Sequence, residues 1–133
     1  MNALKPFLLL LLGLFAGCAT TSSLHTSANR LDNSAERFYM ELRSEPVSRH
    51  SAEDAALLVD ATHEFNRAVS QSRSRENLKP AFDRVAEQYH HLRTQLDNRE
   101  YDGWYRRDRF ESVTEAYLDV ERAMKYPESR YHD

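Results

Sequence analysis

The chain repeats apolar residues with the period of an α-helix in four separate segments. Apolar positions recur at alternating steps of three and four residues over residues 24–42, 55–69, 78–96 and 110–124. This spacing puts them on one face of a helix, and it is typical of helices that pack at a shallow angle. The expected inward positions are Leu24, Ala28, Leu31, Ala35, Phe38 and Leu42; Ala55, Leu58, Thr62, Phe65 and Val69; Leu78, Phe82, Val85, Tyr89, Leu92 and Leu96; and Phe110, Val113, Tyr117, Val120 and Met124. No strand pattern competes with them, so the sequence predicts an all-α fold.

Capping and helix-breaking residues separate the four segments. Ser51 and Asp54 match a capping box at the start of the second helix, and Asn77 is placed to cap the third. The other breaks are Pro46, the polar run 70–74, Asp102–Gly103 and Pro127. Short connections between long helices favour antiparallel neighbours, so we expect an up-down-up-down four-helix bundle over residues 24–126.

This topology predicts which aromatic side chains share a layer of the core. We call the end of the bundle where the first helix starts the proximal end, and the opposite end the distal end. Phe38 and Phe110 should share the distal layers, and Phe65 and Phe82 the proximal layers. Tyr89 and Tyr117 should lie near the middle, and each needs a partner for its hydroxyl or a position at the edge of the core.

The N-terminal segment differs from the rest of the chain in composition. A short cationic start at Lys5 precedes an uncharged apolar run over residues 7–15, which is too short for a stable membrane span and has the form of a secretory signal. Residues 15–18, Phe-Ala-Gly-Cys, resemble the lipobox of bacterial lipoproteins, although that family usually has Leu at the position of Phe15. Cys18 is the only cysteine, so no disulfide forms within the chain.

The resemblance to lipoproteins implies a division of the chain and a location. Residues 1–17 would be a signal peptide, Cys18 would carry the lipid, residues 18–23 would be a tether, and residues 127–133 would form a polar C-terminal tail. Ala19 implies sorting to the outer membrane with the bundle on its periplasmic face. The covalent lipid is the only prosthetic group expected, and three acyl chains hold a protein on a membrane without a further apolar helix. The whole layout resembles that of small all-helical outer-membrane lipoproteins.

Two motifs have the spacing of metal ligands on a helix. Glu87-x-x-His90 matches the motif of carboxylate-bridged di-iron bundles, and Asp60-x-x-His63 has a similar spacing. The apolar register turns all four side chains outward, which argues against an interior site. A surface site formed by Glu87, His90 and His91 stays open, beside the simpler interpretation of exposed polar residues on a solvated face.

The composition argues against several other functions. The formal net charge is −3, which is not that of a nucleic-acid-binding protein. Gly103 is the only glycine after residue 17, so the bundle has no glycine-rich phosphate loop or nucleophile elbow. No Cys-x-x-Cys-His haem attachment site is present, and no spacing of Ser, His, Asp and Glu indicates a catalytic cleft. We therefore do not expect an enzyme.

The distal connection concentrates the residue types that dominate protein interfaces. Within residues 99–109 these are Arg99, Tyr101, Trp104, Tyr105, Arg106, Arg107 and Arg109. They could form a contact site for a periplasmic protein or for the cell wall. Alternatively, Trp104 could cap the end of the bundle while the arginines pair with Asp102, Asp108 and Glu111. The sequence thus predicts a lipid-anchored interaction or scaffolding protein, with a surface metal-binding bundle as the alternative. The oligomeric state stays open.

Overall fold

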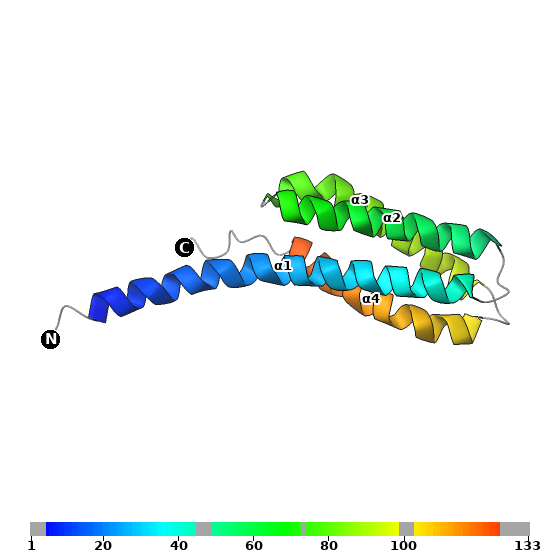
Figure 1. Ribbon diagram of the computed structural model, residues 1–133, viewed down its shortest axis with the longest axis horizontal. Helices are drawn as coiled ribbons and strands as arrows, with labels where there is room; N and C mark the ends of the chain where they lie inside the picture. The colour runs from blue at the N-terminus through cyan, green and yellow to red at the C-terminus, as the bar shows by residue number, and fades with distance from the viewer. Residues whose placement is uncertain (1–4, 45–48, 73, 99–102, 126–133) are drawn as a thin grey trace.

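The computed structural model describes residues 5–44, 49–72, 74–98 and 103–125, and the side chains of residues 23–44, 50–72, 74–98 and 108–125. These residues form four α-helices and no strand (Figure 1). The helices are α1 (Lys5–Arg43), α2 (Arg49–Gln71), α3 (Arg75–Asp97) and α4 (Gly103–Lys125). The all-α prediction is confirmed.

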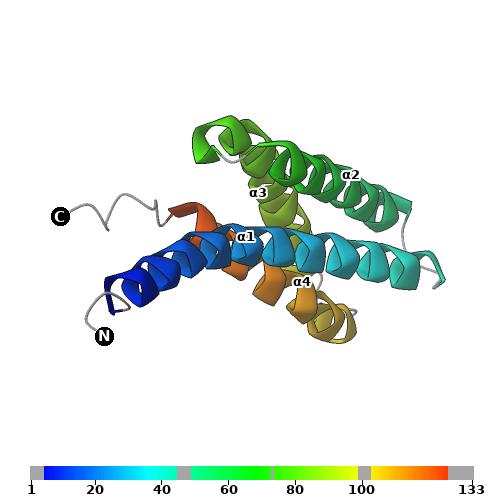
Figure 2. The ribbon, with the colours of Figure 1, turned by 60° about the vertical axis from the view of Figure 1, so that its left-hand side comes forward.

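The helices form a closed ring of antiparallel neighbours. Helix α1 packs against α2 and α4, and α3 packs against α2 and α4. Figures 1 and 2 show that each helix runs opposite to the one before it in the chain. This is the expected up-down-up-down four-helix bundle. The contact between α3 and α4 is the least extensive of the four.

The core occupies the positions that the apolar spacing predicts. All predicted inward side chains are buried except Val69, Phe82 and Met124, which are partly buried and pack against the core. Four further residues are buried that the strict three–four spacing omits: Ser51, Asp54, Ala61 and Ala116. They flank the predicted stripe, because the buried face of a bundle helix is wider than two positions per heptad.

The aromatic side chains form one continuous column through the core. The two predicted phenylalanine pairs are confirmed, with ring centroids 5.1 Å apart for Phe38–Phe110 and 5.8 Å for Phe65–Phe82. Tyr89 and Tyr117 lie between them and form a third pair, with centroids 3.9 Å apart. Two further contacts, Tyr89–Phe110 at 5.5 Å and Phe82–Tyr117 at 6.1 Å, join these pairs to one another. We call the six rings the aromatic column.

Two helices start earlier than the capping residues predict. Helix α2 already includes Ser51 and Asp54, which are buried inside it, so the proposed capping box is wrong. Ser74 is the N-cap of α3, so Asn77 lies within the helix and its Nδ2 donates to Ser72 instead. Capping residues in a sequence define a helix start only to within about one turn.

Helix α1 is much longer than the bundle. It begins at Lys5, so the backbone of residues 18–23, the expected tether, continues the helix. Its N-terminal part extends beyond the other three helices in Figure 1. Over the described residues, none of the helices combines the length and the apolar content that a membrane span requires. The first side chain of α1 that is buried in the described part of the bundle is Leu24, where the bundle was expected to start.

Candidate functional site

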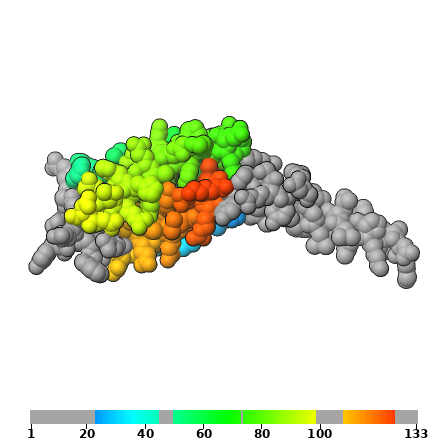
Figure 3. All heavy atoms as spheres, turned by 180° about the vertical axis from the view of Figure 1, so that it is seen from behind, coloured from blue at the N-terminus to red at the C-terminus, as the bar shows by residue number. Residues whose placement is uncertain are grey.

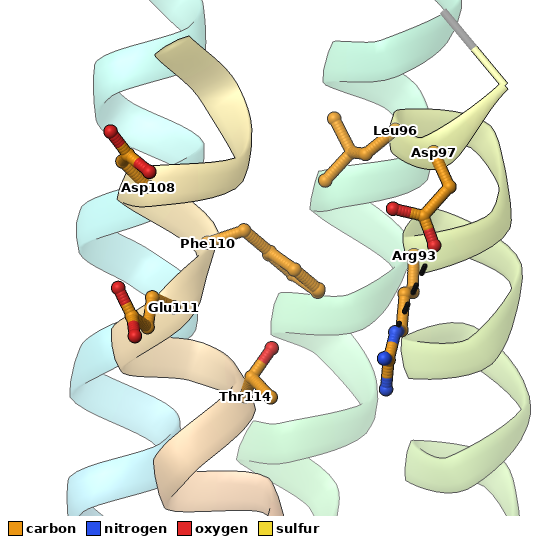
Figure 4. A pocket seen from close by; sticks show the side chains of 7 residues that line it. All are labelled: Arg93, Leu96, Asp97, Asp108, Phe110, Glu111 and Thr114. Atoms are coloured by element: carbon orange, nitrogen blue, oxygen red, sulfur yellow. Dashed lines mark ion pairs between the residues drawn. The ribbon is translucent and has the colours of Figure 1, made fainter. Parts of the chain in front are cut away.

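A cleft of about 470 Å³ opens between α3 and α4 at the distal end of the bundle. Figure 3 shows the outer faces of these two helices side by side, and Figure 4 shows the cleft from close by. Its lining residues are Arg93, Leu96 and Asp97 on α3, and Asp108, Phe110, Glu111 and Thr114 on α4. The cleft exists because α3 and α4 make the least extensive contact in the ring.

Two buried apolar side chains lie beneath the cleft. Phe110 points from α4 towards α3, opposite Leu96 (Figure 4), and each is only 3% exposed. The Phe110 ring stacks on Tyr89 and packs against Phe38, so it belongs to the aromatic column. The cleft therefore exposes little apolar surface at this point, and its accessible walls are formed mainly by polar side chains.

A chain of hydrogen bonds bridges the two helices beside this floor. The Tyr89 hydroxyl donates to Oγ1 of Thr114 at 3.2 Å and accepts a hydrogen bond from Nη1 of Arg93 at 3.4 Å. The Nε atom of Arg93 lies 3.9 Å from the Asp97 carboxylate. The α3 wall of the cleft thus presents a cation whose charge is already balanced.

The α4 wall carries two exposed carboxylates. Asp108 and Glu111 lie on the side of α4 away from Phe110 (Figure 4), and neither has an ion-pair partner among the described residues. Further along α4, by contrast, Glu115 and Asp119 both pair with Arg30 of α1, at 3.4 and 3.2 Å.

A second hydrogen-bonded pair lies on the proximal side of the cleft. The Tyr117 hydroxyl is 3.4 Å from Nε2 of His90, and the Tyr117 ring stacks on Tyr89. Burial raises the pKa of the Tyr117 hydroxyl to about 12, and the Glu121 carboxylate and Tyr89 add to this shift. Both buried tyrosines thus have the hydroxyl partners that were expected.

The predicted contact segment adjoins the cleft, and among the described residues only Asp108 of this segment lines it. Arg109 is half-buried, with its Nε 3.9 Å from the Glu41 carboxylate of α1, so it links α4 to α1. Arg109 is the one arginine of the segment whose side chain is described, so the expected pairing of the other arginines with Asp108 and Glu111 stays a prediction. The backbone of residues 104–107 is helical, in the first turns of α4 rather than in a connection. The side chains of Trp104, Tyr105, Arg106 and Arg107, and all of Arg99 and Tyr101, lie outside the described residues.

The surface residues proposed as metal ligands do not converge. Glu87, His90 and His91 are all exposed. His90 lies next to Tyr117 of α4, whereas Nε2 of His91 is 3.5 Å from the carboxylate of Asp54 on α2. Consecutive residues on a helix point about 100° apart, which turns the two histidines towards different neighbours. In the part of the chain that the structure describes, no three His, Cys, Asp or Glu side chains are grouped to hold a metal ion. The geometry therefore does not support the surface metal site.

Two carboxylates between helices, one partly buried and one buried, were not anticipated. Asp32 of α1 accepts hydrogen bonds from Thr62 at 2.9 Å and from Asn66 at 3.3 Å, both on α2. Asp54 of α2 is more deeply buried, and its Oδ2 has no hydrogen-bond partner; His50 lies 3.8 Å from it. The polar residues at positions 29, 32, 62 and 66 are the one signal in the sequence that indicated a hydrogen-bonded seam.

Comparison with known proteins adds no family to this description. No protein-family model, curated protein or solved structure matches the chain. The function is therefore inferred from the cleft and from the sequence of the N-terminal segment.

Proposed function

We propose that the protein is a lipid-anchored interaction protein that binds a partner at the α3–α4 cleft. In this proposal Cys18 carries the lipid, the outer membrane holds the protein, and the bundle extends into the periplasm. The observation that carries the proposal is the position of the cleft. Helix α1, which contains Cys18, extends beyond the bundle at the proximal end (Figure 1). The residues that line the cleft lie at the opposite, distal end of the bundle.

The length of the bundle would separate the cleft from the membrane surface. Helices α2, α3 and α4 have 23 residues each, so the bundle spans about 35 Å at 1.5 Å per residue. A lipid on Cys18 would keep the proximal end near the membrane, and the cleft would then face a partner beyond the headgroups. The first turns of α4, residues 103–109, start at the same end. Their sequence includes Trp104, Tyr105 and three arginines, and such residues supply most of the binding energy in protein interfaces.

The lipid anchor is tested by replacing Cys18. When the full chain is expressed in bacteria supplied with an alkyne-labelled palmitate, we expect the wild-type protein to take up the label and to sediment with the outer membrane. Cys18→Ser should remain unlabelled and leave the membrane fraction. A wild-type chain that carries no label would contradict the anchor.

The interaction role is tested by crosslinking in intact cells. A photo-crosslinking amino acid at position 111, beside the cleft, should give one defined adduct. The same amino acid at position 60, which is exposed on α2, is the matched control and should give none. Absence of an adduct at position 111, or equal adducts at both positions, would contradict binding at the cleft.

A further inference from the structure

We infer that His63 of α2 forms a pH-sensitive contact with α1, which stabilises the bundle more strongly once the imidazole is protonated in mildly acidic solution. The inference depends neither on the lipid anchor nor on a partner at the cleft. It follows from two carboxylates that meet at one nitrogen atom of this histidine, from the partial burial of one of them, and from the absence of another cation paired with them among the described residues.

Two carboxylates of α1 approach the same atom of His63. Nε2 of His63 lies 2.7 Å from Oε1 of Glu36 and 3.2 Å from Oδ1 of Asp32. The two acids are four residues apart, so they lie on one face of α1. A neutral imidazole leaves their negative charges close together. A protonated imidazole places a positive charge between them, and opposite charges at these distances attract each other.

The contact is partly shielded from water. The Asp32 side chain is 15% exposed, and its carboxylate accepts hydrogen bonds from Thr62 at 2.9 Å and from Asn66 at 3.3 Å. Partly buried charges are screened less by salt than fully exposed ones. The His63 side chain is 42% exposed, so it can exchange protons with water. The contact thus combines a carboxylate held in position with a histidine that is open to the solution.

Among the described residues, His63 is the only basic side chain that contacts these two carboxylates. No lysine or arginine pairs with Asp32 or Glu36 in this part of the chain. On α2 itself, Asp60 and Arg67 lie about one turn before and one turn after His63, and both are exposed. One of them is an acid and the other a base, so together they change the charge around His63 little.

The charged groups at the contact between α2 and α3 are separate from this one. Glu64 pairs with Arg84, whose charge does not change near neutral pH. Asp54 is approached by His50 and His91, so that contact can also respond to protonation. The pH dependence of the whole bundle therefore does not isolate His63. A thermodynamic cycle that compares the single and double variants of one pair does isolate it.

The direction of the effect follows from the charges that are present at each pH. A histidine free in solution is protonated below about pH 6.5, and Asp and Glu are ionised above about pH 5. All three charges are therefore present together near pH 5.5, and the positive one is lost as the pH rises towards 8. Because the contact joins two helices, it exists only in the folded chain, so mild acidification stabilises the folded state through it.

The inference is tested with a double-mutant cycle of His63→Gln and Glu36→Gln in the full-length protein in detergent. Glu36 is chosen because His63 is its only partner among the described residues, whereas Asp32 has others. Urea unfolding gives the equilibrium constant of unfolding for each variant. We expect the interaction between the two residues to lower this constant about fivefold at pH 5.5 and less than about twofold at pH 8.

The matched control is the cycle of Arg84→Gln and Glu64→Gln, an exposed ion pair between α2 and α3 whose cation does not titrate in this range. Its interaction should be equal at both pH values. Circular dichroism checks that all variants stay folded. An interaction between His63 and Glu36 that is equal at both pH values, or absent at both, would overturn the inference. An equally large pH dependence in the control pair would also overturn it, because protonation of His63 would then not be the cause.

Discussion

At the scale of single residues, Tyr117 is the titratable group whose surroundings alter it most among the described residues. Its ring lies in the aromatic column, stacked on Tyr89 and Phe82, and its hydroxyl is 3.4 Å from His90. Burial is the main reason that its pKa rises to about 12. The folded protein therefore holds this proton more tightly than the unfolded chain, in which a tyrosine titrates near pH 10.

This difference predicts how stability changes in alkaline solution. The contribution from Tyr117 is fully present below about pH 10 and is lost as the pH rises towards about 12, because only the unfolded chain readily releases the proton. We expect the urea midpoint of the wild-type protein to fall more between pH 9 and pH 11 than that of Tyr117→Phe. Tyr39→Phe, at a half-buried ring under Arg43, is the matched control and should behave as wild type. Identical slopes for all three proteins would show that the raised pKa of Tyr117 does not contribute.

At the scale of elements, the two contacts of α2 each hold a carboxylate, and the two carboxylates differ in their hydrogen bonding. Asp32, at the contact with α1, is hydrogen-bonded by Thr62 and Asn66. Asp54, at the contact with α3, leaves Oδ2 buried without a hydrogen bond. Burying a polar atom without a hydrogen-bond partner lowers the stability of the folded protein. Removing a polar atom that is hydrogen-bonded also lowers it, because the groups bonded to that atom lose a partner.

The two carboxylates should therefore respond differently to the same substitution. Asp32→Leu should lower the free energy of unfolding by about 1 kcal/mol, because it removes one acceptor from each of two donors. The Asn66 amide then keeps only the Oδ1 of Asn29, and the Thr62 hydroxyl keeps only the carbonyl of Val59. Asp54→Leu should leave it unchanged or raise it by about 1 kcal/mol. Urea unfolding of each variant measures both values. A loss at position 54 as large as that at position 32 would mean that the contacts of Asp54 with His50 and His91 stabilise the bundle.

At the scale of the whole molecule, the bundle and the N-terminal part of α1 are separable in the structure. Side-chain burial along the described part of α1 begins at Leu24, and the helix before it extends past the other three (Figure 1). Stability should therefore come from residues 24 onwards.

Deletions from the N-terminus test this separation. A chain that starts at residue 23 should melt within about 3 °C of the full-length protein, because it keeps every side chain that is buried among the described residues. A chain that starts at residue 32 loses Leu24, Ala28 and Leu31 from the core and should melt more than about 10 °C lower. Thermal melts followed by circular dichroism distinguish the two. A large loss from the shorter deletion would show that the extended part of α1 supports the bundle.

The sequence by itself determined the features that depend on helical periodicity. A residue's face on a helix follows from its position in the three–four spacing, so the core residues were predicted almost completely. The two phenylalanine pairs, and the place of both tyrosines between them, followed from the up-down topology, because helices of similar length bring the same layers together. The starts of α2 and α3 were missed because a capping residue is a weak local signal that core packing overrides.

Only the tertiary structure determined which helix surfaces are in contact and which leave a cleft between them. The α3–α4 cleft depends on the spacing of two helices, which is set by every side chain between them and not by any local pattern. The same holds for His90 and His91, which face different helices although they are adjacent in sequence, and for Asp54, whose burial depends on α3. The apolar periodicity predicts which side of each helix is buried. How closely each pair of helices approaches is determined only by the packing of the whole bundle.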